Sequence, residues 1–126
     1  MQIEPISTGD APAAIGPYSQ GIKAHGFVYT SGQIPLDPST GSLVGGSFEE
    51  QVHRVFRNLE AILTAAGTSF DRVIKATVYV TDLGNFGTLN SIYASYFGEH
   101  KPARTTVEVS ALPKDATVEI DLIALA

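Results

Sequence analysis

Seven residues in predicted strands or turns have the groups that ligand chemistry needs. They are Tyr18, Ser19, Ser31, Gly32, Arg104, Thr106 and Glu119. Arg104 opens a predicted strand in the segment PARTTVEV, with no acidic residue beside it and no cluster of basic neighbours. It is therefore either an ordinary surface charge or a group that binds a ligand. Each of the others has an equally ordinary structural role when taken singly, since most surface polar groups do no chemistry.

The residues themselves exclude several kinds of catalytic site. The chain has no cysteine, which removes disulfides, thiolate zinc sites and a cysteine nucleophile. It also lacks the G-x-S-x-G elbow, the P-loop and the dinucleotide-binding G-x-G-x-x-G. The histidines, His25, His53 and His100, are far apart in sequence and have no metal-ligand spacing. No metal site is expected.

Composition limits the kind of protein and its partners. A chain of 126 residues has the size of one domain, so we predict a single domain over residues 1–126. The formal net charge is −5 and the basic residues are scattered, which argues against a nucleic-acid or anionic-membrane surface. Only 17% of the residues are charged, which suggests that part of the surface is buried against other subunits.

The N-terminal segment MQIEPISTGD carries acids and a proline where a signal peptide needs basic residues and then an apolar run. No apolar run approaches the roughly 20 residues that cross a bilayer. We therefore expect a cytoplasmic protein without a membrane segment.

Glycine and proline divide the first third of the chain into short segments. YSQGIKA and FVYTSG flank AHG, a pattern typical of a β-hairpin with a glycine turn, and IPLDPSTGSLVGG is predicted to be a surface loop. A helix is predicted from Ser47 to Gly67. Ser47 and Glu50 form a capping-box pattern, and apolar residues then repeat every three or four positions up to the glycine.

The second half of the chain alternates strands with one more helix. Residues 72–81, RVIKATVYVT, have apolar side chains at both parities, as in a strand buried on both sides. A helix is predicted from about Asn85 to Gly98, with an aromatic stripe that is expected to lie in the core. Two strands follow over 104–111 and 116–125, joined by LPKD.

Side-chain alternation gives the strand over 104–111 two different faces. Arg104 and Thr106 share a face with Glu108 and Ser110, while the more apolar set is Thr105, Val107, Val109 and Ala111. We expect the apolar set to receive the helices, which puts Arg104 and Thr106 on the face away from them. A tight hairpin at LPKD would also bring Glu108 close to Glu119, an unfavourable pairing of like charges.

The predicted element order is β(ββ)αβαββ, and the expected fold class is α+β. One mixed β-sheet with two helices packed on one face satisfies this order, because each helix has one apolar stripe. The other face of the sheet then stays half-apolar and uncovered. We expect oligomerisation to bury it.

Blocks along the whole chain resemble the RidA/YjgF family of reactive imine and enamine deaminases. They are APAAIGPYSQG, SGQIPLDPSTG, QVHRVFRNLEAILTAAG, VIKATVYVTDLGNF, NSIYASYF and PARTTVEVSALPKDATVEIDLIA, of which the last resembles the family's signature. The resemblance implies a chorismate-mutase-like fold. It also implies a homotrimer whose sheets face inward and whose ligand sites lie between subunits.

The resemblance implies roles for the candidate residues. Arg104 would hold the carboxylate of the substrate, since a planar guanidinium binds a carboxylate through two parallel hydrogen bonds. Glu119 would position or activate the attacking water. Tyr18, Ser31 and the backbone of Gly32 would complete the pocket.

One position departs from the family pattern. Many members have a cysteine two residues after the arginine, whereas this chain has Thr106. Threonine still offers a hydroxyl to a ligand. The departure leaves substrate preference and any thiol-dependent behaviour open.

The expected function is hydrolytic deamination of 2-iminobutanoate, 2-iminopropanoate or the enamine 2-aminoacrylate to 2-oxo acids and ammonia. Imines are already electrophilic, so no cofactor is expected. The expected partners are small 2-imino and 2-oxo carboxylates and copies of the chain itself. Two alternatives stay open. One is a non-catalytic carboxylate-binding or interaction protein, and the other is an endoribonuclease, which the acidic charge and the separated histidines disfavour.

Overall fold

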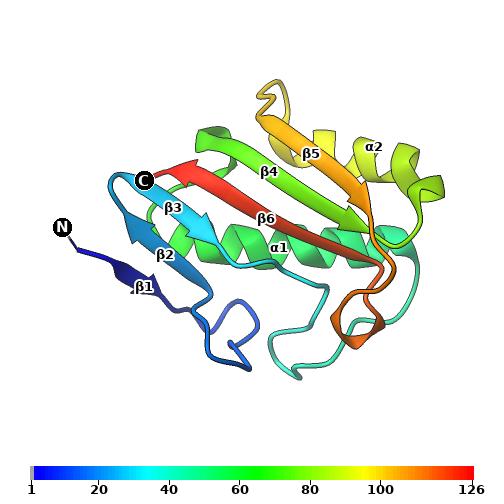
Figure 1. The fold of residues 1–126 in the computed structure, drawn as a ribbon, viewed down its shortest axis with the longest axis horizontal. Helices are drawn as coiled ribbons and strands as arrows, with labels where there is room; N and C mark the ends of the chain where they lie inside the picture. The colour runs from blue at the N-terminus through cyan, green and yellow to red at the C-terminus, as the bar shows by residue number, and fades with distance from the viewer. Residues whose placement is uncertain (1) are drawn as a thin grey trace.

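The computed structural model describes residues 2–126 as one six-stranded mixed sheet with two helices behind it (Figure 1). The strands are β1 (Glu4–Ile6), β2 (Gly21–Ala24), β3 (Phe27–Thr30), β4 (Val73–Val80), β5 (Ala103–Glu108) and β6 (Val118–Leu125). The helices are α1 (Phe48–Ala65) and α2 (Phe86–Phe97), and 3-10 turns cover Phe70–Arg72, Leu83–Asn85 and Pro113–Asp115. The predicted order of strands and helices is confirmed, as is the α+β class with both helices on one face of a mixed sheet.

The hairpin and the first helix form as predicted, and both depend on interactions between residues close in sequence. β2 and β3 pair antiparallel around His25 and Gly26, whose φ angles of 53° and 79° suit a tight hairpin turn. The Ser47 hydroxyl accepts a hydrogen bond from the Glu50 N–H at 3.2 Å and so caps the N-terminus of α1. Gly67, with φ at 81°, lies just beyond the helix and reverses the chain.

The core lies between the sheet and the two helices. Four alternate residues of β6, Val118, Ile120, Leu122 and Ala124, are at most 1% exposed. Phe56 of α1 is fully buried, stacks on Tyr96 with ring centroids 4.5 Å apart, and meets Tyr93 and Phe97 edge-on. Most of the aromatic stripe of α2 therefore packs against α1, as predicted. Within residues 2–126, neither helix has the length and apolar character that a bilayer span requires.

The last two strands are not neighbours, which corrects the predicted hairpin at LPKD. The strand order is β1-β2-β3-β6-β4-β5, so β4 lies between β6 and β5, antiparallel to β6 and parallel to β5. Glu119 is in register with Tyr79, and Glu108 is in register with Val80. The Glu108 carboxylate accepts a hydrogen bond from the Leu83 N–H at 2.9 Å. The expected pairing of Glu108 with Glu119 does not form.

The two faces of β5 are the reverse of the prediction. Arg104 and Thr106 are in register with Ala76 and Val78 of β4, which are fully buried beneath the helices. Arg104 and Thr106 therefore face the helix layer, and Val107 lies on the uncovered face, where it is 38% exposed. The physical reason is the position of β5 at the edge of the sheet. An edge strand has a sheet neighbour on one side only, and Arg104 meets α2 through Phe86 and Tyr93, so its helix-facing side does not have to be uniformly apolar.

Candidate functional site

Arg104 lies between β5 and α2 with its guanidinium against two aromatic rings. Its Cζ is 4.8 Å from the ring centroid of Tyr93 and 5.5 Å from that of Phe86. Phe86 and Tyr93 are seven residues apart on α2, so they lie on the same side of the helix about two turns apart. Cation–π contacts hold a guanidinium by its plane. The N–H groups at its edge stay available to a ligand.

Three buried oxygens on the elements around Arg104 have no hydrogen-bond partner within residues 2–126. They are Asn90 Oδ1, the Tyr93 hydroxyl and Thr106 Oγ1. Asn90 and Tyr93 are three residues apart on α2, and Thr106 follows Arg104 on the same face of β5. Buried polar groups are nearly always hydrogen-bonded. Three unpaired oxygens on adjoining elements therefore mark this region as a candidate polar site.

A cavity of about 210 Å³ borders Arg104 near the C-terminal end of α2. Its wall includes the apolar side chains of Tyr93, Phe97 and Pro102. Ligand sites typically combine such apolar walls with a few polar groups that fix orientation. The space beside Arg104 can therefore accept a small apolar group of a ligand whose acid binds the guanidinium.

Glu119 lies on the uncovered face of β6 and lines a second cavity, of about 110 Å³, together with Tyr18 and Gly32. Gly32 is so close that a Cβ at this position would lie 2.9 Å from Glu119 Cδ. Only a residue without a side chain leaves the Glu119 carboxyl in place there. The Ser31 hydroxyl donates a hydrogen bond to the Ser19 carbonyl oxygen at 2.5 Å, which ties the segment that carries Tyr18 to the end of β3.

The carboxyl group of Glu119 is in an environment that favours its protonated form. Burial raises the pKa of Glu119, and the charge of Asp121 on the same face of β6 raises it further. Burial also raises the pKa of Asp121, against the opposing effects of a hydrogen bond with Tyr79 and the charge of Lys75. A carboxylate of raised pKa is a stronger base than an ordinary one. Glu119 is therefore suited to take a proton from water.

The sheet divides the predicted site residues into two groups. Tyr18, Ser31, Gly32 and Glu119 lie together at the uncovered side, and Arg104 and Thr106 lie at the helix side of the edge strand β5. This corrects the expectation that strand alternation puts Arg104 and Thr106 on the uncovered face. Within one copy of the chain, the cavity that Glu119 lines is different from the cavity that Arg104 lines.

Three residues of α2 are not assigned to the site by the sequence pattern: Phe86 and Tyr93, whose rings contact Arg104, and Asn90, whose buried Oδ1 has no hydrogen-bond partner within residues 2–126. An aromatic stripe at helical spacing predicts core packing, and nothing in the local sequence marks Asn90 as a ligand group. Two signals were nevertheless present. An asparagine interrupts the apolar stripe, and Arg104 lacks a local acidic partner, which leaves aromatic faces as the other common support for a guanidinium.

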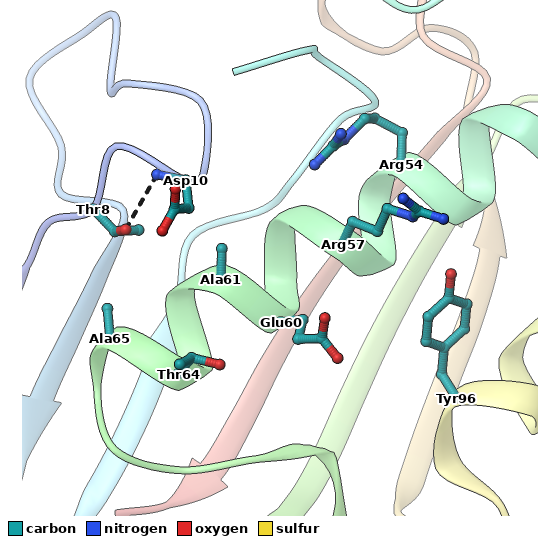
Figure 2. A pocket seen from close by; sticks show the side chains of 9 residues that line it. All are labelled: Thr8, Asp10, Arg54, Arg57, Glu60, Ala61, Thr64, Ala65 and Tyr96. Atoms are coloured by element: carbon teal, nitrogen blue, oxygen red, sulfur yellow. Dashed lines mark hydrogen bonds between the residues drawn. The ribbon is translucent and has the colours of Figure 1, made fainter. Parts of the chain in front are cut away.

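A separate hollow of about 620 Å³ lies over the outer face of α1 (Figure 2). Arg54, Arg57 and Glu60 project into it from the helix, and Asp10 and Tyr96 border it from other segments. Side chains of both charge signs line this hollow, and it contains none of the predicted site residues.

The three histidines lie on different segments. His25 is in the turn between β2 and β3, His53 Nδ1 lies 2.7 Å from the Tyr96 hydroxyl, and His100 Nε2 lies 2.6 Å from the Val73 carbonyl oxygen. In the part of the chain that the structure describes, no three or more His, Asp or Glu side chains gather in the manner of a metal site.

Comparison with known proteins places the whole chain in one family. The mouse protein named 2-iminobutanoate/2-iminopropanoate deaminase is 49% identical over 120 residues, covering 95% of this chain and 89% of the mouse protein. The family model described as endoribonuclease L-PSP matches residues 8–126. The chain belongs to the RidA/YjgF family. The resemblance seen in the sequence is thereby confirmed.

Solved structures of RidA/YjgF proteins share this fold. A Rid family protein of unknown function, YyfA from Yersinia pestis, is 49% identical with a TM-score of 0.97, covering 99% of this chain and all of the other. E. coli TdcF with bound serine is 44% identical with a TM-score of 0.92, covering 98% of both chains. The family thus includes proteins named for deamination and for RNA cleavage. The geometry of the site is therefore needed to distinguish deamination from RNA cleavage.

Proposed function

We propose that the protein hydrolyses reactive 2-imino acids and their enamine tautomers to 2-oxo acids and ammonia. The substrates would include 2-iminobutanoate, 2-iminopropanoate and 2-aminoacrylate. The observation that carries the proposal is the Arg104 guanidinium held against Tyr93 and Phe86, which leaves its N–H edge for the carboxylate of a ligand. The name of the mouse deaminase supports the reaction, and the serine bound to TdcF supports a small ligand with a carboxylate.

The proposed reaction needs only water and proton transfers. Arg104 binds the carboxylate, and Glu119 takes a proton from a water molecule as its oxygen adds to C2 of the imine. The C=N double bond becomes single and the nitrogen takes the proton that Glu119 holds, which gives a 2-amino-2-hydroxy acid. The hydroxyl proton then passes to the nitrogen as the C–N bond breaks, so that ammonia leaves and the C–O bond becomes the 2-oxo group. An enamine first gains a proton at C3 and loses one from nitrogen, which converts it to the imine. No electrons are exchanged with another molecule, so no redox cofactor is required.

We further propose that three copies assemble through their uncovered faces in a chorismate-mutase-like trimer. These faces carry exposed apolar side chains, among them Tyr29 at 43% and Val107 at 38% exposure, which favours burial against another copy. A head-to-tail contact that closes into a ring brings different surfaces of two copies together. Arg104 of one copy would then meet Glu119 of the next, which is how residues on opposite faces of one sheet would serve one site.

Mixing two inactive variants tests both the reaction and the shared site. Wild-type protein should accelerate the decay of 2-iminobutanoate made in place by an amino-acid oxidase, and Arg104→Ala and Glu119→Gln should each lose most of that acceleration. Refolded together in equal amounts, the two variants should regain activity, because about a quarter of the sites would combine an intact Arg104 with an intact Glu119.

Two results would count against these proposals. Unchanged decay of several imino acids in the presence of wild-type protein contradicts the deaminase. Mixed trimers that exchange subunits but remain inactive contradict the site shared between copies.

The contacts of Arg104 also favour a second candidate, a non-catalytic pocket for small carboxylates. Such a pocket needs Arg104 but not Glu119, so the Glu119→Gln variant separates the two. Retained binding of 2-oxobutanoate with lost ammonia release supports the enzyme. The description of the family model favours RNA cleavage as a third candidate. Cleavage of single-stranded RNA that survives Arg104→Ala would support that reading over the deaminase.

A further inference from the structure

We propose that the ring of Tyr93, assisted by Phe86, is the positioning element that orients Arg104 for carboxylate binding. The two rings would hold the guanidinium plane, so that its N–H edge meets the ligand in a fixed direction. The inference rests on the proposed role of Arg104 as the carboxylate anchor, and it does not depend on the deamination step.

The geometry places Arg104 within cation–π range of both rings. The distances from Cζ to the ring centroids are 4.8 Å for Tyr93 and 5.5 Å for Phe86. Such contacts are effective within about 6 Å of the centroid. Both rings come from one side of a single rigid helix, so their positions relative to Arg104 are fixed together.

Aromatic support suits an anion-binding arginine better than an acidic partner does. A carboxylate partner would occupy the N–H donors that a substrate carboxylate needs, whereas a ring contacts only the face of the guanidinium. A free arginine side chain also loses considerable rotamer freedom when a ligand orders it. Rings that order the side chain before binding reduce that cost.

The contact depends on the ring of Tyr93 and not on its hydroxyl. The hydroxyl is buried and has no hydrogen-bond partner within residues 2–126. A phenylalanine at this position would keep the ring face against Arg104 and remove the unpaired group. Tyr93→Phe should therefore preserve the orientation of Arg104, and Tyr93→Leu should lose it.

Tyr93 is also a packing residue, so its positioning role needs a matched control. Its ring meets Phe56 edge-on with centroids 5.9 Å apart. Tyr96, on the same helix, stacks on Phe56 with centroids 4.5 Å apart, and no cation–π contact joins it to Arg104 among residues 2–126. Tyr96→Leu removes an aromatic ring from the same cluster and leaves the support of Arg104 intact.

Binding of 2-oxobutanoate, a stable 2-oxo carboxylate, measures the role directly by titration calorimetry. Tyr93→Leu should raise the Kd roughly 3- to 30-fold, the range expected for loss of a partly desolvated cation–π contact. In the imine assay its KM should rise by a similar factor and its kcat should change less, because Glu119 is untouched. Tyr93→Phe keeps the ring and loses only the hydroxyl, so its Kd should rise by less than that of Tyr93→Leu. Tyr96→Leu should lower Tm and bind as wild type does.

Three outcomes would overturn the inference. They are a folded Tyr93→Leu variant with unchanged Kd, a loss of affinity in Tyr96→Leu equal to that in Tyr93→Leu, and a Tyr93→Phe variant as weak as Tyr93→Leu. If Tyr93→Leu does not fold, the partly exposed Phe86 replaces it, and Phe86→Leu should raise the Kd by a smaller factor of about 2 to 5. Phe86→Leu with unchanged Kd would then overturn the inference.

The same titration keeps this inference separate from the proposed reaction. A wild-type protein that binds 2-oxobutanoate in a Tyr93-dependent way but does not accelerate imine decay supports the positioning role and contradicts the deaminase. A wild-type protein that does not bind 2-oxobutanoate contradicts the carboxylate anchor, and the positioning role with it.

Discussion

Arg104 and Glu119 acquire their properties from different kinds of neighbour. Arg104 lies against the ring faces of Tyr93 and Phe86. Glu119 is half-buried beside Asp121, and both burial and that like charge raise its pKa. One residue is thereby prepared to hold a carboxylate and the other to accept a proton.

Replacing Asp121 by asparagine should move the acidic limb of the pH profile of kcat/KM to lower pH. The negative charge of Asp121 raises the pKa of Glu119, so its removal lets Glu119 remain a carboxylate in more acidic solution. The profile can be measured with 2-iminobutanoate, and the exposed Asp10→Asn serves as the control. An acidic limb that stays in place or moves to higher pH would contradict the assigned role of Glu119.

Glu119 and Asp121 should also make the stability of the fold depend on pH. The direction of this dependence is opposite to that of an ordinary ion-paired acid. The pKa values of Glu119 and Asp121 are raised in the folded chain, so the folded state binds more protons than the unfolded state above the usual carboxyl pKa. Their contribution to stability is therefore greatest in acid and falls as pH rises through the raised pKa values. Asp121→Asn should flatten that fall in a series of Tm measurements.

At the scale of secondary-structure elements, helix caps and the packing of neighbouring elements determine the position and orientation of each segment. α1 begins at a serine cap, ends at a glycine turn and buries one stripe, so local signals are sufficient to define it. β5 is different because it is an edge strand. It turns its more polar side, with Arg104 and Thr106, toward α2, and this orientation puts Arg104 within reach of the aromatic rings.

Removing the cap of α1 should cost stability without changing the site. Ser47→Ala loses the hydrogen bond to the Glu50 N–H, and the free energy of unfolding should fall by about 1 kcal/mol. Ser47→Asn keeps a side-chain oxygen at the cap and should stay close to wild type. Denaturant unfolding at one fixed protein concentration compares the variants. Equal losses in both would show that the cap hydrogen bond is not the cause.

At the scale of the whole molecule, the uncovered face of the sheet is the surface that one copy of the chain leaves exposed despite its apolar side chains. It combines exposed apolar side chains such as Tyr29 and Val107 with the half-buried acids Glu119 and Asp121. Assembly through this face would bury the apolar groups and give one proposed site its two halves from neighbouring copies. Activity and assembly should therefore be lost together.

A single charge on this face should dissociate the proposed trimer. Val107→Asp buries an unpaired carboxylate if the face is an interface, so the variant should sediment as a monomer and lose imine-deaminating activity. Thr64→Asp introduces the same side chain at a position of similar size on the exposed side of α1, and it should leave both properties unchanged. A Val107→Asp protein with the wild-type mass in solution would contradict assembly through this face.

The sequence by itself determined the elements and the family. The hairpin at His25 and Gly26 and the helix that starts at Ser47 depend on φ angles, caps and periodicity, which are properties of neighbouring residues. The helix-facing side of β6 was also predictable, because every second residue there is apolar. The motif blocks resembled the RidA/YjgF family along the whole chain.

Only the tertiary structure decided the neighbours of β5 and the surroundings of Arg104. Alternation places Arg104 and Thr106 on one face of a strand, but it does not say which face the helices cover when neither side is strongly apolar. The insertion of β4 between β6 and β5 is a pairing of segments distant in sequence, which local patterns do not encode. That pairing separates Arg104 from Glu119 across the sheet. It also brings Tyr93 beneath Arg104, because α2 leads directly from β4 to β5 and covers the edge strand.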